Sequence, residues 1–87
     1  MEESKIIKMG YSIQAFMQKE KLESAKPKDL MPYLVEQGYF TKDQREGLPL
    51  RNILRDLDDE NKLYLLPNLQ ADRKEVNTFW SFVIIDK

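Results

Sequence analysis

The sequence predicts a small α+β domain in which three helices are followed by a β-hairpin. Two observations support this fold class. Apolar residues recur at spacings of three and four in three segments of the first 60 residues, as in amphipathic helices. Beyond Asn61 the period shortens to two, and the chain closes on a stretch dense in β-branched and aromatic side chains. We expect the 87 residues to form a single domain, residues 1–87.

A first helix that runs to about Glu23 is predicted from apolar residues at spacings of three and four. Two starting points remain open. The helix begins near Glu3 and tolerates Gly10 at a cost of about 1 kcal/mol relative to alanine, or it begins at Ser12 as an N-cap. Pro27 then interrupts the period, so residues 24–27 are predicted to form a connector that includes a small strand. The periodic residues are Ile6, Ile7, Met9, Ile13, Phe16 and Met17.

The second helix is predicted to begin at Leu30 with Asp29 as its N-cap. This start places Pro32 in the first turn, where its missing N–H breaks no intrahelical bond. A start at Pro27 is the less favoured alternative. Gly38 is predicted to end the helix in the left-handed conformation. A helical turn over residues 42–46 would lead into the next helix.

The third helix, residues 49–60, has the clearest helical period of the chain. Gly47 provides a flexible entry and Pro49 suits the first turn. An apolar stripe faces the core, and it consists of Leu50, Ile53, Leu54 and Leu57. Off this stripe lie Arg51, Asn52 and Arg55, which form the candidate working surface. The acids that follow are Asp56, Asp58, Asp59 and Glu60, so any phosphate contact must use the N-terminal half of the helix.

The hairpin is predicted from two apolar strands, Lys62 to Leu66 and Val76 to Ile85, joined by the polar residues 70–75. In the second strand, alternation places Trp80, Phe82 and Ile84 on the core side. The opposite face exposes three apolar residues, which require a cover: the first helix, a second copy of the chain or another protein. A homodimer is therefore a serious possibility. The predicted interface consists of Phe79, Val83 and Ile85.

Composition narrows the possible functions. A content of 41% hydrophobic and 33% charged residues is typical of a globular protein. No run approaches the roughly 20 apolar residues of a membrane span, and the N-terminus lacks a secretory signal, so we expect a cytoplasmic protein without a membrane. The chain has no cysteine and no histidine, and its acidic run lacks the pattern of a calcium loop. We therefore expect no enzyme, no metal and no cofactor.

The order of elements resembles that of winged helix-turn-helix domains, in particular the small HARE-HTH-like domains. The resemblance rests on KPKDLMPYLVEQGYF, GLPLRNILRDL, LYLLP and the closing NTFWSF, and it covers most of the chain. It implies a winged helix-turn-helix fold in which the hairpin is the wing. It also implies binding to double-stranded DNA, with the third helix in the major groove and the hairpin loop on the adjacent backbone. Many winged helices instead bind proteins.

The resemblance also implies a set of DNA contacts. Arg51, Asn52 and Arg55 would face the groove, because Arg pairs with guanine and Asn with adenine. Phosphate contacts would come from Arg73 and Lys74 in the wing and from Lys26, Lys28 and Lys42 near the helix ends. The competing interpretation is a solvated helix face and a solvated loop tip.

The charge balance bears on this choice. The net charge is −1 and the pI is near 5.4, which argues against bulk electrostatic coating of nucleic acid. Residues 19–28 and 42–55 each carry two more cations than anions, so the basic charge is local. The leading hypothesis is a DNA-binding regulator that acts by occupancy. The alternative is an interaction module of the same fold, an adaptor or dimerisation domain.

Overall fold

The computed structural model describes residues 2–42, 47–75 and 78–85. Within these residues the chain forms three helices and a three-stranded antiparallel sheet, which confirms the α+β class. The elements in chain order are α1 (Glu3–Glu20), β1 (Ser24–Ala25), α2 (Pro27–Glu36), α3 (Leu48–Asp59), the 3₁₀ helix η1 (Leu63–Leu65), β2 (Leu69–Arg73) and β3 (Thr78–Val83).

Helix α1 takes the earlier of the two predicted starts, at Glu3, and includes Gly10. A Cβ at Gly10 would lie 2.9 Å from Cδ2 of Leu66, so the glycine permits close packing of α1 against the segment after α3. The helix ends at Glu20, and Lys21 adopts the left-handed conformation with φ 57°. The connector contains the small strand that the sequence predicts, β1.

The predicted start of α2 is wrong. The helix begins at Pro27, and Asp29 lies in its first turn instead of capping it. The carboxylate of Asp29 accepts a hydrogen bond from the backbone N–H of Lys26 at 3.1 Å, so it serves an N-terminal donor from inside the helix. The predicted end is confirmed, since Gly38 has φ 85° and the N–H of Tyr39 donates to the carbonyl of Leu34.

Helix α3 agrees closely with its prediction. Leu50, Leu54 and Leu57 are buried, and Ile53 packs against the same core. Gly47 caps the helix with φ 99°. A Cβ at this position would lie only 2.7 Å from the backbone nitrogen of Lys28. The N-terminus of α3 therefore packs directly on the first turn of α2.

The predicted first strand of the hairpin is wrong. Residues 63–65 form η1, and β2 lies instead at 69–73, of which residues 70–73 belong to the predicted polar loop. The consecutive residues Leu65 and Leu66 are both buried, which an extended strand with alternating side chains does not allow but a helical turn does. Strand β2 pairs with β3 from Leu69 opposite Phe82 to Arg73 opposite Thr78.

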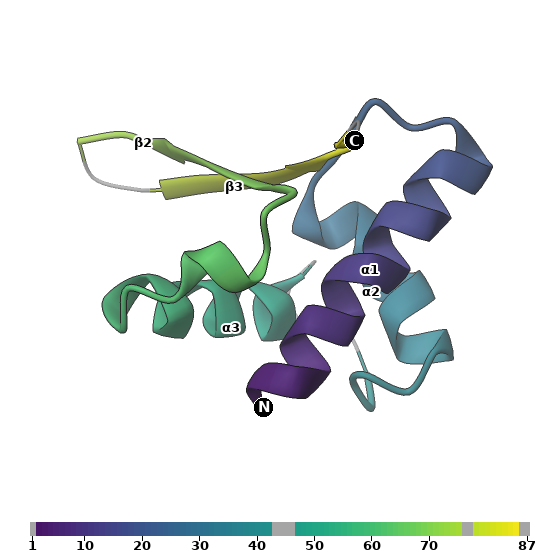
Figure 1. Cartoon of the computed structure of the whole chain (residues 1–87), viewed down its shortest axis with the longest axis horizontal. Coiled ribbons are helices and arrows are strands. Elements are labelled where there is room, and N and C mark those ends of the chain that lie inside the picture. The colour runs from purple at the N-terminus through teal and green to yellow at the C-terminus, as the bar shows by residue number, and fades with distance from the viewer. Residues whose placement is uncertain (1, 43–46, 76–77, 86–87) are drawn as a thin grey trace.

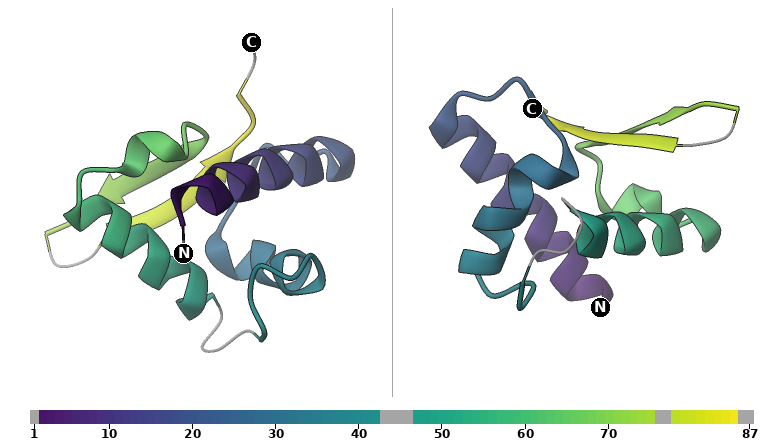
Figure 2. Two further views of the ribbon diagram at one scale, coloured as in Figure 1. Left: turned by 60° about the horizontal axis from the view of Figure 1, so that its bottom comes forward. Right: turned by 180° about the vertical axis from the view of Figure 1, so that it is seen from behind.

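Strand β3 is the centre of the sheet, between β1 and β2. Trp80 and Phe82 are buried, and Ile84 packs against the core, so the predicted inner face is confirmed. Figure 1 shows α3 running along one face of the β2–β3 hairpin, with α1 and α2 near the C-terminal end of β3. The two further views in Figure 2 show the same arrangement. Among the described residues, no helix is long and apolar enough to cross a bilayer.

Candidate nucleic-acid interface

The outward face of α3 carries the residues that the sequence predicts to contact DNA. Asn52 and Arg55 are exposed, and Arg51 is half-buried. Arg51 and Arg55 are four residues apart and Asp58 follows three residues later, so the three side chains form a row along one flank of the helix. Arg51 and Arg55 make the first two positions of this row cationic, and Asp58 makes the third anionic.

The β2–β3 hairpin is anchored to the same flank. Nη2 and Nη1 of Arg73, at the end of β2, lie 2.6 and 2.7 Å from the two carboxylate oxygens of Asp58. This two-pronged ion pair is the geometry in which guanidinium and carboxylate fit best. Its hydrogen bonds hold the pKa of the Asp58 carboxyl below its ordinary value of 3.8. The structure therefore brings Arg73 to the row on α3, where a carboxylate of the protein engages it.

The other predicted wing contact is also paired. Nζ of Lys74 lies 3.2 Å from a carboxylate oxygen of Asp72, and both side chains are largely exposed. An exposed pair of this kind opens at little cost, so Lys74 remains accessible to a phosphate. The ion pair of Arg73 differs from that of Lys74 because its carboxylate partner, Asp58, lies on another element of the fold, α3.

The stability that the Asp58–Arg73 ion pair gives the fold depends on pH, and the lowered pKa of Asp58 sets the direction of this dependence. Since the carboxyl binds its proton less readily in the folded chain, the pair stabilises the fold above about pH 4 and loses this contribution as the pH falls through the lowered pKa. We expect wild type to melt at a higher temperature than Asp58→Asn at about pH 6, with the difference shrinking progressively as the pH falls below about 4.

Circular dichroism melts at both pH values measure this effect. The matched control is Asp59→Asn, the neighbouring exposed carboxylate, which has no ion pair within the part of the chain that the structure describes. A difference between wild type and Asp58→Asn that persists unchanged in acid would contradict an origin in the ion pair.

The lysines near the helix ends lie close to the N-terminus of α3. The contact between Gly47 and Lys28 places the first turns of α2 and α3 side by side. Lys26 and Lys28 are exposed there. The partial positive charges of two helix N-termini add to those of the lysines. Lys42 is exposed as well, and the helical turn predicted over 42–46 lies largely outside the described residues.

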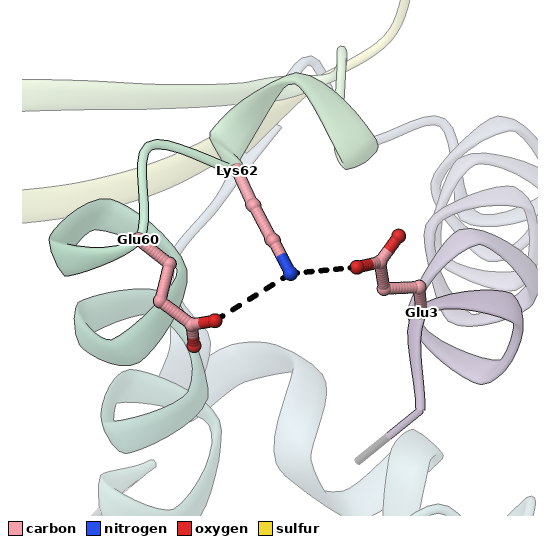
Figure 3. Close-up of polar contacts among 3 residues, drawn as sticks. All are labelled: Glu3, Glu60 and Lys62. Carbon is pink, nitrogen blue, oxygen red and sulfur yellow. Dashed lines mark hydrogen bonds and ion pairs between the residues drawn. The ribbon is translucent and has the colours of Figure 1, made fainter.

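The C-terminal end of α3 has the opposite character. Asp56, Asp59 and Glu60 are exposed. Lys62 lies between two carboxylates, 2.7 Å from Oε2 of Glu3 and 3.5 Å from Oε1 of Glu60, and joins the start of α1 to the end of α3 (Figure 3). The hydrogen bond to Glu3 raises the pKa of the Lys62 ammonium. The C-terminal end of α3 is therefore acidic, whereas Arg51 and Arg55 lie earlier on the helix.

The three predicted interface residues differ in their surroundings. Phe79 is 58% exposed on the outer face of β3. Val83 is half-buried, and its N–H donates to the carbonyl of Asn68. Ile85 is held by α1, because the side-chain amide of Gln14 donates to its carbonyl at 2.9 Å and accepts from its N–H at 3.2 Å. The structure thus leaves Phe79 as the open apolar residue of this set.

Sequence reasoning did not identify the roles of Asp58, Gln14 or Lys62. Each acts through a partner between 15 and 71 positions away in the chain. No local pattern signals such a pair. Among the described residues, no group of three or more acidic side chains is placed to hold a metal ion. Comparison of the chain with protein-family models, with curated proteins and with solved structures finds no match.

Proposed function

We propose that the chain is a winged helix-turn-helix domain and a small cytoplasmic regulator that binds double-stranded DNA by occupancy, without catalysis. The observation that carries the proposal is the alignment of two elements on one flank. Arg51 and Arg55 lie four residues apart on α3, and the Arg73–Asp58 pair anchors the hairpin beside them. A helix and a hairpin on one side of a domain suit a groove and its adjacent backbone.

The charge distribution sets the orientation of the proposed complex. The first two turns of α3 and Arg55, which follows them directly, would enter the major groove, where Arg55 and Asn52 reach base edges. Lys26 and Lys28, beside the start of α3, would contact the flanking phosphates. The acidic end of the helix would point away from the duplex. Few phosphate contacts are available in this arrangement, so we expect modest affinity that falls as salt is added.

Fluorescence anisotropy with a labelled mixed-sequence duplex, at about 50 and 200 mM salt, tests the proposal. We expect Arg55→Ala to weaken binding by about tenfold, the typical effect of losing a base contact. Lys8→Ala on α1 removes the same charge from an exposed position outside the proposed contact residues, so it serves as the matched control.

Asp58→Asn should act in the opposite direction. It removes an anion one turn from Arg55 while the asparagine oxygen still accepts a hydrogen bond from Arg73, so we expect binding roughly threefold tighter at low salt. Absence of binding at low salt, or equal losses in Arg55→Ala and Lys8→Ala, would refute the DNA interface.

A second candidate function is a protein-interaction module of the same fold, including a homodimer. The exposure of Phe79 on the outer face of β3 supports it, together with the acidic pI. This face lies opposite the core and away from α3. Sedimentation of wild type and Phe79→Asp separates the two functions. If β3 forms an interface with a second copy, Phe79→Asp should lower the mass of the sedimenting species and leave DNA affinity unchanged.

A further inference from the structure

A pocket of about 380 Å³ opens between α1, the segment 65–68 and the residue pair that follows β3. This volume lies within the range of small-molecule sites in proteins. Its apolar walls come from Ile7 and Tyr11 of α1, from Leu65 and from Ile85. Ile7 is 39% and Tyr11 66% exposed, which is high for such side chains. Large apolar residues left open around a concavity are the usual composition of a ligand site.

The residues that the structure describes around the pocket are uncharged. One third of the chain consists of Asp, Glu, Lys and Arg, yet none of the described ones lines it. An ionised ligand would lose its hydration there without gaining a counter-charge, which is strongly unfavourable. The lining therefore selects a neutral ligand.

Asn68 gives the pocket a directional polar group. The residue is only 2% exposed, and its Nδ2 donates to the carbonyl of Gly10 at 3.3 Å. Within the described part of the chain its Oδ1 accepts no hydrogen bond, and no fully buried side-chain oxygen or nitrogen is left without a partner. Oδ1 is therefore not sealed from solvent, and Asn68 is one of the residues that line the pocket. Oδ1 is an acceptor that a donor on the ligand would satisfy.

The walls are fixed before any ligand arrives. The two hydrogen bonds between Gln14 and the backbone of Ile85 hold the C-terminal wall against α1. The close contact of Gly10 with Leu66 fixes the floor, and Asn68 is tied to β3 through Val83. Such pre-organisation lowers the entropy lost on binding.

We propose that this pocket binds a neutral aromatic small molecule through its apolar walls, with one N–H or O–H group of the ligand donating to Oδ1 of Asn68. The site lies between α1 and the base of the hairpin, apart from the outward face of α3. The proposal therefore does not depend on DNA binding.

The test uses N-phenyl-1-naphthylamine, a neutral fluorescent amine with a single N–H. We expect saturable one-to-one binding to the wild-type chain. Ile7→Glu should weaken it at least tenfold because it places a charge in the wall, and Tyr11→Glu should do the same. Both positions are exposed, so the fold tolerates the changes. Ser4→Glu, at an exposed position of α1 outside the pocket, is the matched control and should bind as wild type does.

Two further measurements separate this ligand from other occupants. The competitor diphenyl ether, with an ether oxygen in place of the N–H, should displace the probe several-fold less well than diphenylamine, which lacks the naphthylamine fluorophore of the probe. Probe affinity should also be independent of protein concentration. Equal competition, equal binding by Ile7→Glu and Ser4→Glu, or affinity that falls as the protein concentration rises, as expected if a second copy fills the pocket, would each overturn the proposal.

Discussion

Phe82→Ala is expected to lower the free energy of unfolding by about 3–5 kcal/mol, the usual cost of truncating a fully buried phenylalanine. Phe82 is 0% exposed and is the largest of the fully buried side chains. It also pairs with both neighbouring strands, opposite Ala25 and Leu69. A domain of this length has a total stability of about 4–13 kcal/mol. The loss is a large fraction of this total, so the variant should unfold at a clearly lower urea concentration than wild type.

Phe79→Ala is the matched control for this prediction. It makes the same chemical change on the same strand, but on the outer face, where the ring is 58% exposed. We expect a change within about 0.5 kcal/mol. Urea unfolding followed by circular dichroism measures both. Similar losses in the two variants would mean that the outer face of β3 is covered as the inner face is.

Gly47→Ala is expected to cost about 2–4 kcal/mol, from two causes that add. An alanine at φ 99° is strained by about 1–2 kcal/mol. The new Cβ would also lie 2.7 Å from the nitrogen of Lys28 and 3.0 Å from the carbonyl carbon of Pro27, both backbone atoms that move only with the helix. The first turns of α2 and α3 would have to separate. Since that junction carries Lys26 and Lys28, the proposed DNA-binding function further predicts that affinity for a duplex falls in this variant.

Gly38→Ala separates the two causes. Gly38 has a similar φ of 85°, but a Cβ there would meet nothing within 4 Å. Its cost should be the strain alone, about 1–2 kcal/mol. Urea unfolding of both variants gives the difference, which measures the contact between α2 and α3. Equal losses would show that the contact contributes nothing to stability.

The sequence predicts most clearly those features whose cause is local. The leucine stripe of α3 follows from the geometry of one helix, and the inner face of β3 follows from alternation along one strand. The end of α2 at Gly38 follows from the conformation that a glycine adopts easily. All three are confirmed. The start of α1 remained open because Gly10 has a cost within the helix that only its contact with Leu66 explains.

The errors fall where local signals compete. Asp29 is a good cap in isolation, yet it serves the N-terminus of α2 equally well from the first turn, which moves the helix start to Pro27. Strand β2 contains the polar residues Gln70, Asp72 and Arg73, all of them exposed. This polar composition is typical of a loop. The pairing of β2 with β3 supplies the backbone hydrogen bonds that make it a strand.

The sequence by itself determined the α+β class, the helix that carries the candidate interface and the residues on its outward face, because side-chain periodicity depends only on neighbours along the chain. The tertiary structure alone decided that Arg73 binds Asp58, that Lys26 and Lys28 lie beside the start of α3, and that Asn68 lines a pocket with Ile7 and Ile85. Each of these joins segments that are distant in sequence. Their proximity arises from the burial of the shared core, which no local pattern encodes.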